Sequence, residues 1–286
     1  MSKMIIMRGL PASGKSSKAK QMVNDTGNCV RINKDLLRTM LHFDRFTFKN
    51  EDLTRDAART LAKMFLEKNI NVIIDDTNLH AGTLQSWKDL AKESKAKIAY
   101  GDCTGVDINE CIKRDAIREK KVGKDVIINM ALRSGLYKIP GPIVICDLDG
   151  TLCNIDHRLH FVKDEKKDWK SFYDHLHLDP VNEKVLTAIK YAHRGGCSIV
   201  FVSGRPDTCK EATLAWLAKN KINFFTTLIM RGAHDHRPDD EVKKDIITQH
   251  FDLKDIATVI DDRPRVIRMW KELGLNVVDV GHGIEF

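Results

Sequence analysis

Residues 4–16 read Met4-Ile-Ile-Met-Arg-Gly9-Leu-Pro-Ala-Ser-Gly14-Lys15-Ser16. An apolar run is followed by a turn that matches G-x-x-x-x-G-K-[ST] and then by a stretch with helical spacing, the context in which this motif binds phosphates. Gly9 and Gly14 let the backbone bend so that successive N–H groups and a helix N-terminus surround phosphate oxygens. We expect Lys15 to reach the outer phosphates and the Ser16 hydroxyl to hold magnesium. The stretch predicts a strand, a nucleotide-binding loop and a helix.

The 286 residues around this motif are about twice a usual domain length, which predicts one large or two medium domains. A content of 42% apolar and 30% charged residues is typical of globular proteins and excludes a disordered or fibrous chain. No window approaches eighteen uncharged apolar residues and no cleavable leader is evident, so we expect neither a membrane partner nor secretion, but a cytoplasmic location. Seven cysteines without a C-x-x-C pair favour reduced thiols over disulfides or zinc.

Charge is distributed unevenly along the chain. Residues 1–138 hold 26 basic and 17 acidic residues, a net +9, whereas residues 139–286 hold 21 and 23, a net −2. The asymmetry suggests two functional units, the first more attractive to a polyanion, although ordinary solvated surface is the alternative. The segment Leu136-Tyr-Lys-Ile-Pro-Gly-Pro142 interrupts regular structure. We therefore expect domains at 1–138 and 143–286.

Short apolar runs alternate with longer stretches of helical spacing in both halves, which predicts α/β folds with buried, mainly parallel sheets. Ligands of such sheets collect at the carboxyl ends of strands, so the residues that follow each run are the candidates for function. The runs lie at 4–7, 72–74 and 97–100 in the first half, and at 143–146, 198–202, 228–230, 257–260 and 276–280 in the second.

Three polar residues after strands of the first half indicate a phosphate acceptor site. Asp35 follows a short strand and could take a proton from an acceptor hydroxyl, and Arg38, one helical turn later, could bind an acceptor phosphate. Asp76 follows another strand, where a carboxylate can orient a nearby arginine or assist the metal, and we expect it to orient Arg38. The alternatives are a helix N-cap for Asp35, an exposed helix position for Arg38 and an Asx turn for Asp76.

A basic segment farther along could form a lid. The stretch from Lys113 to Lys124 holds six basic and two acidic residues, and Arg114 and Arg118 share one helical face. An arginine that reaches the transferring phosphoryl group stabilises its charge, and we choose Arg118 first and Arg114 second. A solvated helix face is the alternative.

Paired carboxylates follow the first strand of the second half. Asp147 and Asp149 suit covalent phosphate chemistry, in which one carboxylate attacks phosphorus while the other protonates the departing oxygen and magnesium balances the charge. The segments after three later apolar runs add further polar groups. The first offers a hydroxyl and backbone N–H groups for a phosphate oxygen, the second offers a lysine, and the third offers a carboxylate pair that suits magnesium. These are Ser203, Gly204 and Arg205, then Lys243, then Asp261 and Asp262.

Between about residues 153 and 181 lies a polar, aromatic insertion that could cap the second site. It contains Trp169, Phe172 and Tyr173 near several histidines that lack convincing zinc spacing. The rings could stack on a substrate base, although a small core of the cap is the more favoured use of them.

With these residues in view, the whole chain resembles the phage-type polynucleotide kinase/phosphatase family, a 5′-kinase followed by a 3′-phosphatase. The first half is similar through GLPASGKS, NKDLLR, DDTN and KRDAIR. The second half resembles the haloacid-dehalogenase superfamily through DLDGT, VSGR, RPDDEVK and IDDR. The resemblance implies a P-loop kinase domain and a Rossmannoid phosphatase domain with a small cap. It also implies ATP and Mg²⁺, ends of RNA or DNA as substrates, coupling to a ligase and a homo-oligomer.

The resemblance also implies roles for individual residues. Asp35 is then the general base, Arg38 holds the acceptor's 3′-phosphate, Asp147 is the nucleophile and Asp149 the general acid. Asp76 supports Arg38, Ser203 and Lys243 bind phosphate, and Gly204, Arg205, Arg231 and Arg237 are further substrate contacts. ATP is contacted by Gly9, Ala12, Ser13, Gly14, Lys15, Ser16, Ser17 and Arg118. Magnesium of the phosphatase is held by Asp147, the Asp149 carbonyl, Asp261 and Asp262. Competing hypotheses are a kinase/phosphatase pair acting on a small metabolite and a non-enzymatic nucleotide-dependent adaptor.

Overall fold

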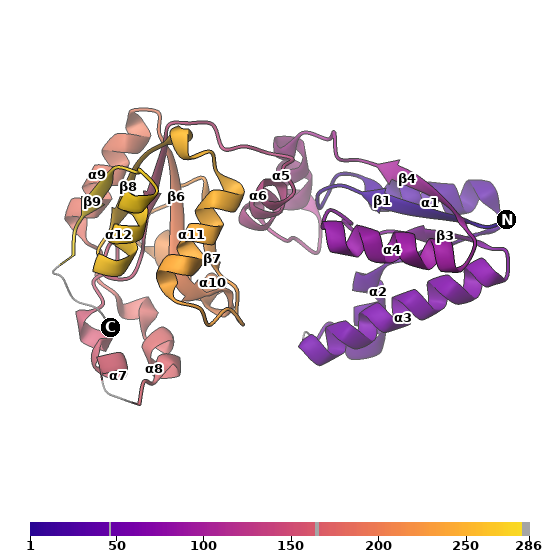
Figure 1. Ribbon diagram of the computed structural model, residues 1–286, viewed down its shortest axis with the longest axis horizontal. Coiled ribbons are helices and arrows are strands. Elements are labelled where there is room, and N and C mark those ends of the chain that lie inside the picture. The colour runs from indigo at the N-terminus through magenta and orange to yellow at the C-terminus, as the bar shows by residue number, and fades with distance from the viewer. Residues whose placement is uncertain (46, 164–165, 282–286) are drawn as a thin grey trace. The chain divides into compact units, whose positions relative to one another are not determined.

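The computed structural model describes residues 1–45, 47–163 and 166–281, and it divides the chain into two units, Met1–Leu136 and Tyr137–Phe286. Each unit contains one parallel sheet with helices packed on it (Figure 1). The predicted α/β fold with a parallel sheet in each half is therefore confirmed. No helix among the described residues combines the length and the hydrophobicity that are needed to cross a bilayer.

The first unit has a four-stranded sheet in the order β2-β3-β1-β4, and all its pairs are parallel. The strands are β1 (Lys3–Arg8), β2 (Cys29–Ile32), β3 (Asn71–Ile74) and β4 (Lys97–Asp102). The helices are α1 (Lys15–Thr26), α2 (Lys34–His42), α3 (Phe48–Glu67), α4 (Ala81–Glu93), α5 (Ile108–Ile117) and α6 (Lys124–Arg133).

Alternation along β1 divides the core of this unit into two layers. Met4 and Ile6 face one side of the sheet and pack with Leu66 of α3 and Trp87 of α4. Met7 faces the other side and packs with residues of α1. Because side chains of a strand point alternately to its two faces, a continuous apolar run such as 4–7 requires helices on both sides.

The second unit has a five-stranded parallel sheet in the order β7-β6-β5-β8-β9. Its strands are β5 (Ile143–Cys146), β6 (Ser198–Pro206), β7 (Thr227–Arg231), β8 (Ile256–Asp261) and β9 (Val277–Asp279). The longer helices are α9 (Glu183–Arg194), α10 (Lys210–Lys219), α11 (Asp239–His250) and α12 (Pro264–Glu272).

The segment between β5 and α9 forms the expected small insertion. It contains two short helices, α7 (His160–Lys163) and α8 (Trp169–Asp174), which lie beyond one end of the sheet (Figure 1). Bridges join Cys153 to Asp149 and to Val181, so the insertion leaves and re-enters the unit at one place. We call this segment, described here for residues 153–163 and 166–181, the cap.

Strand register brings the loops that follow the strands together. Ile6 of β1 pairs with Ile74 of β3, so the loop after β1 lies beside the DDTN segment. Cys146 of β5 pairs with Phe201 of β6 and with Ile260 of β8, so Asp147 lies between the polar residues that follow these strands. The carboxyl edge of each sheet is therefore where the candidate residues meet.

Candidate active sites

The loop after β1 has the backbone that a phosphate cradle requires. Gly9 and Gly14 adopt φ angles of +146° and +91°, and a Cβ at Gly9 would lie 2.7 Å from Oγ of Ser13. Residues after β3 support the loop, since the Gly9 N–H donates to the Thr77 carbonyl and the Asn78 amide donates to the Met7 carbonyl. A larger residue at Gly9 would therefore break the loop, which explains the motif's first glycine.

Lys15 opens α1 and is nearly buried in this loop. Its Nζ donates to the Leu10 carbonyl at 2.5 Å and lies 3.4 Å from Oγ of Ser13. Burial lowers the pKa of Lys15, and the positive charge of Arg118 adds to this effect, whereas Asp75 opposes it. A phosphate would supply the anion that a buried ammonium favours, so the arrangement fits a nucleotide.

Asp35 and Arg38 form a pair on α2. Nη1 of Arg38 lies 2.7 Å from Oδ1 of Asp35, whose side chain is largely exposed. The other edge of the guanidinium is held by Glu51 of α3, with Nε and Nη2 donating to its two carboxylate oxygens at 2.8 and 2.9 Å. The helix begins at a defined place because the Asn33 side chain accepts from the Leu36 N–H. Asp35 and Arg38 are thus presented together at the carboxyl end of β2.

The expected support of Arg38 by Asp76 is wrong in this structure. Oδ1 of Asp76 accepts from the Lys34 N–H at 3.1 Å, and its Oδ2 lies 3.8 Å from Nζ of Lys34. Neighbouring Asp75 pairs with Arg31 at 2.6 Å. Burial raises the pKa of Asp76 to about 6, against the opposing effect of Lys34. Asp76 therefore supports the start of α2 rather than the arginine, and Glu51 takes the role expected of it.

The basic segment lies beside the phosphate cradle. Nη1 of Arg114 lies 3.9 Å from the position a Cβ would take at Gly14, and Arg118 is close enough to affect the pKa of Lys15. Buried Asp115 pairs with Nε of Arg118 at 2.6 Å and accepts from the Gly123 N–H at 2.8 Å. Arg114 thus lies against the loop, Arg118 is near enough to influence Lys15, and Asp115 anchors the turn that carries Arg118.

In the second unit, a buried lysine joins three carboxylates. Nζ of Lys243 lies 3.0 Å from Asp147, 3.0 Å from Asp261 and 3.4 Å from Asp239. Burial alone would lower the pKa of Lys243, but the three carboxylates raise it well above its usual value. The three carboxylates therefore favour the charged form of the lysine beside Asp147. A charge at this position can neutralise a phosphoryl group that approaches the same carboxylate.

Asp147, Asp261 and Asp262 offer a set of oxygen ligands within 4.8 Å of one another. Burial, and then Asp261, raise the pKa of Asp262 to about 6. Hard divalent cations such as Mg²⁺ prefer carboxylate oxygens, and a cation would offset this crowding of negative charge. Gly150 is essential to the geometry, because with φ at +82° it brings the backbone so close that a Cβ would lie 2.1 Å from Oδ2 of Asp262.

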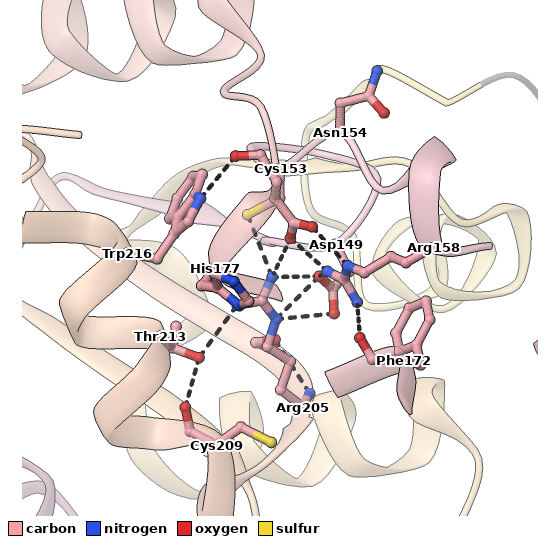
Figure 2. Close-up of polar contacts among 12 residues, drawn as sticks. Asp149, Cys153, Asn154, Arg158, Phe172, His177, Arg205, Cys209, Thr213 and Trp216 are labelled. Carbon is pink, nitrogen blue, oxygen red and sulfur yellow. Dashed lines mark hydrogen bonds and ion pairs between the residues drawn. The ribbon is translucent and has the colours of Figure 1, made fainter. Parts of the chain in front are cut away.

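Asp149 lies between two buried arginines (Figure 2). Nη2 of Arg158 and Nη2 of Arg205 each lie 2.5 Å from its Oδ1, and both arginines also contact buried Asp179. Burial would raise the pKa of Asp149, but Arg205 and Arg158 outweigh it and hold that pKa well below its usual range. The structure thus presents Asp149 as an ionised carboxylate.

The expected contact of Arg205 with substrate is contradicted by this network. Arg205 is 1% exposed, and its guanidinium contacts Asp149 and, through Nη1 at 3.2 Å, the Thr213 hydroxyl (Figure 2). It also contacts Asp179 at 3.1 Å. Arg205 instead positions Asp149. Ser203, also buried, accepts from the Arg205 N–H through its hydroxyl. Of the VSGR segment, Gly204 lines the open pocket described next.

A pocket of about 700 Å³ opens above Asp147 and Asp149. Cap residues form one wall, and the loop after β7 forms another with Arg231 and Arg237. Arg231 donates to the Gly204 carbonyl and pairs with Asp239 at 3.2 Å. Arg237 pairs with Asp235 and Asp245. Both arginines border the pocket, and each is paired with a carboxylate.

Sequence reasoning did not find four residues of these sites. Glu51 is one of several charged residues on its helix, and nothing in the sequence distinguishes it. Arg158 and Asp179 lie in the polar cap, and no role was predicted for either. Asp239 lies in the RPDDEVK segment, of which only Lys243 was predicted to bind phosphate. Only Asp239 carried a signal, since it precedes Lys243 by four residues and therefore shares its helical face.

Comparison with known families agrees with this geometry. The family described as the polynucleotide kinase PNKP phosphatase domain matches residues 141–284, just over half of the chain. The chain belongs to this family. Residues 4–133 match an AAA domain, the part that contains the phosphate cradle. The resemblance to a kinase followed by a phosphatase is thereby confirmed at the level of both halves.

Proteins similar to this chain include one of Autographa californica nuclear polyhedrosis virus that is named as a bifunctional polynucleotide kinase/RNA ligase. It is 26% identical and covers 96% of this chain and 42% of its own length. An L-seryl-tRNA(Sec) kinase of Methanococcus maripaludis is 32% identical over 44% of this chain and 50% of its own length. The chain thus spans half or less of the length of these curated relatives. A solved chain of the Pnkp1/Rnl/Hen1 RNA repair complex is 26% identical with a TM-score of 0.43, covering 99% of this chain and 97% of that one.

Proposed function

We propose that the chain is a bifunctional enzyme that heals nucleic-acid ends. The first unit transfers the ATP γ-phosphate to a polynucleotide 5′-hydroxyl, and the second hydrolyses a 3′-terminal phosphate. The observation that carries this proposal is the presence, in one chain of this family, of a phosphate cradle with an Asp35–Arg38 pair and of a carboxylate centre around Lys243.

In the kinase reaction, Lys15 binds the outer phosphates of ATP and leaves its present hydrogen bond to the Leu10 carbonyl. Exposed Asp35 takes the proton of the attacking hydroxyl, and Arg38, fixed by Glu51, binds the phosphate on the 3′ side of the first nucleotide. Arg118 contacts the transferring phosphoryl group, with Arg114 beside the cradle. Enzymes accelerate phosphoryl transfer mainly by positioning the reactants and stabilising the charge of the transition state. We therefore assign each of these residues a role in positioning or in charge stabilisation.

In the phosphatase reaction, Asp147 attacks phosphorus and becomes an aspartyl phosphate while the nucleoside 3′-oxygen leaves. Lys243 and Ser203 neutralise and bind the phosphoryl oxygens. Water then attacks the intermediate, and ionised Asp149 accepts its proton. In the first step Asp149 must carry a proton to the leaving oxygen, which requires it to move away from at least one of its two arginines.

Magnesium fits both units through their oxygen ligands. In the first unit Ser16 would hold it, and in the second Asp147, Asp261, Asp262 and the Asp149 carbonyl would do so. When bound, the ion lowers the charge on the phosphate oxygens and so favours attack by an anionic nucleophile.

We further propose that the enzyme works in the cytoplasm, as an oligomer of identical chains, and prepares ends for a ligase. The seven cysteines, all described, are free thiols, which suits a reducing compartment. The viral relative named for both polynucleotide kinase and RNA ligase supports the coupling to ligation.

One assay tests the proposed reactions together. The protein is incubated with magnesium, γ-labelled ATP, and RNA and DNA oligomers that bear 5′-hydroxyl and 3′-phosphate ends. We expect label to join the 5′ end and inorganic phosphate to leave the 3′ end, both lost on chelation of magnesium. Transfer to small metabolites but to no oligomer would contradict the proposal, and so would recovery of unchanged ATP and oligomers.

A further inference from the structure

The cap places an aromatic surface at the mouth of the phosphatase pocket. Trp169, Phe172 and Tyr173 lie within one turn and a half of α8 and line the same pocket as Asp147 and Asp149. The Trp169 and Tyr173 rings are nearly parallel, with centroids 5.9 Å apart and an angle of 20°, and Phe172 meets Trp169 edge-on at 5.7 Å. We call these three residues the aromatic platform.

The rings differ in solvent exposure, so a ring that packs in the core of the cap can be distinguished from one that a ligand can reach. Phe172 is 1% exposed and forms the base of the platform, whereas the Trp169 residue is exposed at 41%. Trp169 therefore lines the pocket while much of its ring stays uncovered by the cap. The outer ring is therefore available for a ligand.

The platform is fixed to the catalytic network. The guanidinium carbon of Arg158 lies 4.1 Å from the centroid of the Phe172 ring, and Nη1 of the same arginine donates to the Phe172 carbonyl. Arg158 in turn holds Asp149 at 2.5 Å. The rings thus have a defined position relative to the carboxylates that act on phosphorus.

Charges around the pocket suit a nucleotide rather than a neutral aromatic ligand. Lys167 lies over the Trp169 ring with Nζ 5.6 Å from its centroid, and Arg231 and Arg237 line the same pocket. Stacking on aromatic rings beside cationic groups is the usual means of binding single-stranded nucleic acid without reading its sequence. A pocket of about 700 Å³ has room for a nucleotide.

From these observations we infer that Trp169 stacks on the base of the nucleotide that carries the 3′-phosphate, which makes the phosphatase selective for nucleic-acid ends over other phosphate esters. Tyr173 supports the indole from below, and exposed Lys167 moves from the ring to a phosphate of the bound strand. This inference rests on the proposed phosphatase function and specifies its substrate class.

The test compares two oligonucleotides of one sequence that both end in a 3′-phosphate. One carries a base on its last nucleotide, and the other carries a stable abasic analogue there. Stacking of a base on an aromatic side chain contributes roughly 5- to 150-fold to binding. We therefore expect wild type to favour the base-bearing end by about tenfold in kcat/KM. Trp169→Ala should remove this preference, and Trp169→Phe should retain most of it. Tyr191→Ala, which removes an exposed aromatic residue outside the pocket, is the control and should behave as wild type.

A binding measurement that keeps Trp169 in place tests the stacking even if Trp169→Ala disturbs the fold of the cap. The other three tryptophans, Trp87, Trp216 and Trp270, are at most 4% exposed, so Trp169 is the one indole that a base can reach. In an Asp147→Asn background, the base-bearing oligonucleotide should quench tryptophan emission saturably and the abasic one should not.

The outcomes separate the two claims. Equal turnover of both ends by wild type, a preference that survives Trp169→Ala, or equal quenching by both oligonucleotides would overturn the stacking and leave the phosphatase standing. Failure of wild type to release phosphate from either end would instead contradict the proposed function itself.

Discussion

Nε and Nη2 of Arg38 lie 2.8 and 2.9 Å from the two carboxylate oxygens of Glu51. This two-point contact between α2 and α3 fixes the guanidinium that we propose binds the acceptor's phosphate. Hydrogen bonds to charged groups contribute about 1.5–3 kcal/mol. We therefore expect Glu51→Ala to raise the KM for an acceptor with a phosphate after its first nucleotide by about tenfold or more, with little change in the KM for ATP.

A matched control for this change is Glu93→Ala, which removes an exposed glutamate that pairs with Lys63. Surface ion pairs of this kind contribute little, so its kinetic constants should equal those of wild type. An equal rise in the KM for acceptors that lack the phosphate would show that Glu51 acts on the fold of α2 and not through Arg38.

The close approach of Gly150 to Asp262 gives a second prediction. Gly150→Ala places a methyl group 2.1 Å from Oδ2 of Asp262 at a left-handed φ, so the DLDGT loop must shift. Phosphate release should fall by at least about 100-fold, as expected when a catalytic loop moves by about an ångström. Kinase activity should be unaffected. Gly232→Ala, where an added Cβ meets nothing within 4 Å, should keep both activities. Normal phosphatase kinetics in the Gly150 variant would refute this account of the loop.

Asp76 should make the free energy of unfolding depend on pH. Its pKa in the fold, about 6, lies above the usual value near 4, so the folded state binds the proton more tightly. The stability that this proton contributes is complete below the unfolded pKa and is lost as pH rises through 6. Asp76→Asn keeps an oxygen that can accept from the Lys34 N–H. It should stabilise the protein by about 3 kcal/mol at pH 7.5, a gain that vanishes near pH 4. Urea denaturation at both values measures it, and a gain that is the same at both would be incompatible with the titration.

Arg158 offers a fourth prediction, because it is fully buried against Asp149 and Asp179. Arg158→Met leaves both carboxylates short of a partner, and breaking a buried pair costs about 3–5 kcal/mol. Phosphate release should fall by at least about 100-fold, because Asp149 loses one of the groups that set its position. Arg194→Met, an exposed arginine of α9, should stay within about 0.5 kcal/mol of wild type. Urea denaturation and single-turnover phosphate release test this, and full activity in Arg158→Met would exclude the positioning role.

The sequence could predict residues that lie at the carboxyl end of a strand or on the loop and helix start that follow it. Lys15, Asp35, Asp147 and Asp261 each follow an apolar run, and parallel pairing brings such residues to one edge. Glu51 could not be found this way, because its partner Arg38 lies on a different helix and a glutamate on a charged helix has many equivalents. The roles of Arg158 and Asp179 could not be predicted either, because their contacts depend on how the cap folds back onto the sheet and not on local sequence spacing.

The assignment of Asp76 failed for a related reason. The DDTN motif presents two adjacent carboxylates, and the sequence does not say which way each one points. In the structure Asp75 pairs with Arg31 and Asp76 contacts Lys34, so neither reaches Arg38. The expected role of Arg205 failed because a positive charge at a strand end binds an anion, and here that anion is Asp149 rather than the substrate.

The central claim is that one chain holds two separate phosphorus-transfer sites. The most direct test follows both reactions of one oligonucleotide, with labelled ATP and a 3′-phosphate, in wild type, Asp35→Asn and Asp147→Asn. We predict that Asp35→Asn loses 5′ labelling and keeps phosphate release, and that Asp147→Asn does the reverse. Loss of both activities from either single change, in a protein that remains folded, would contradict the account.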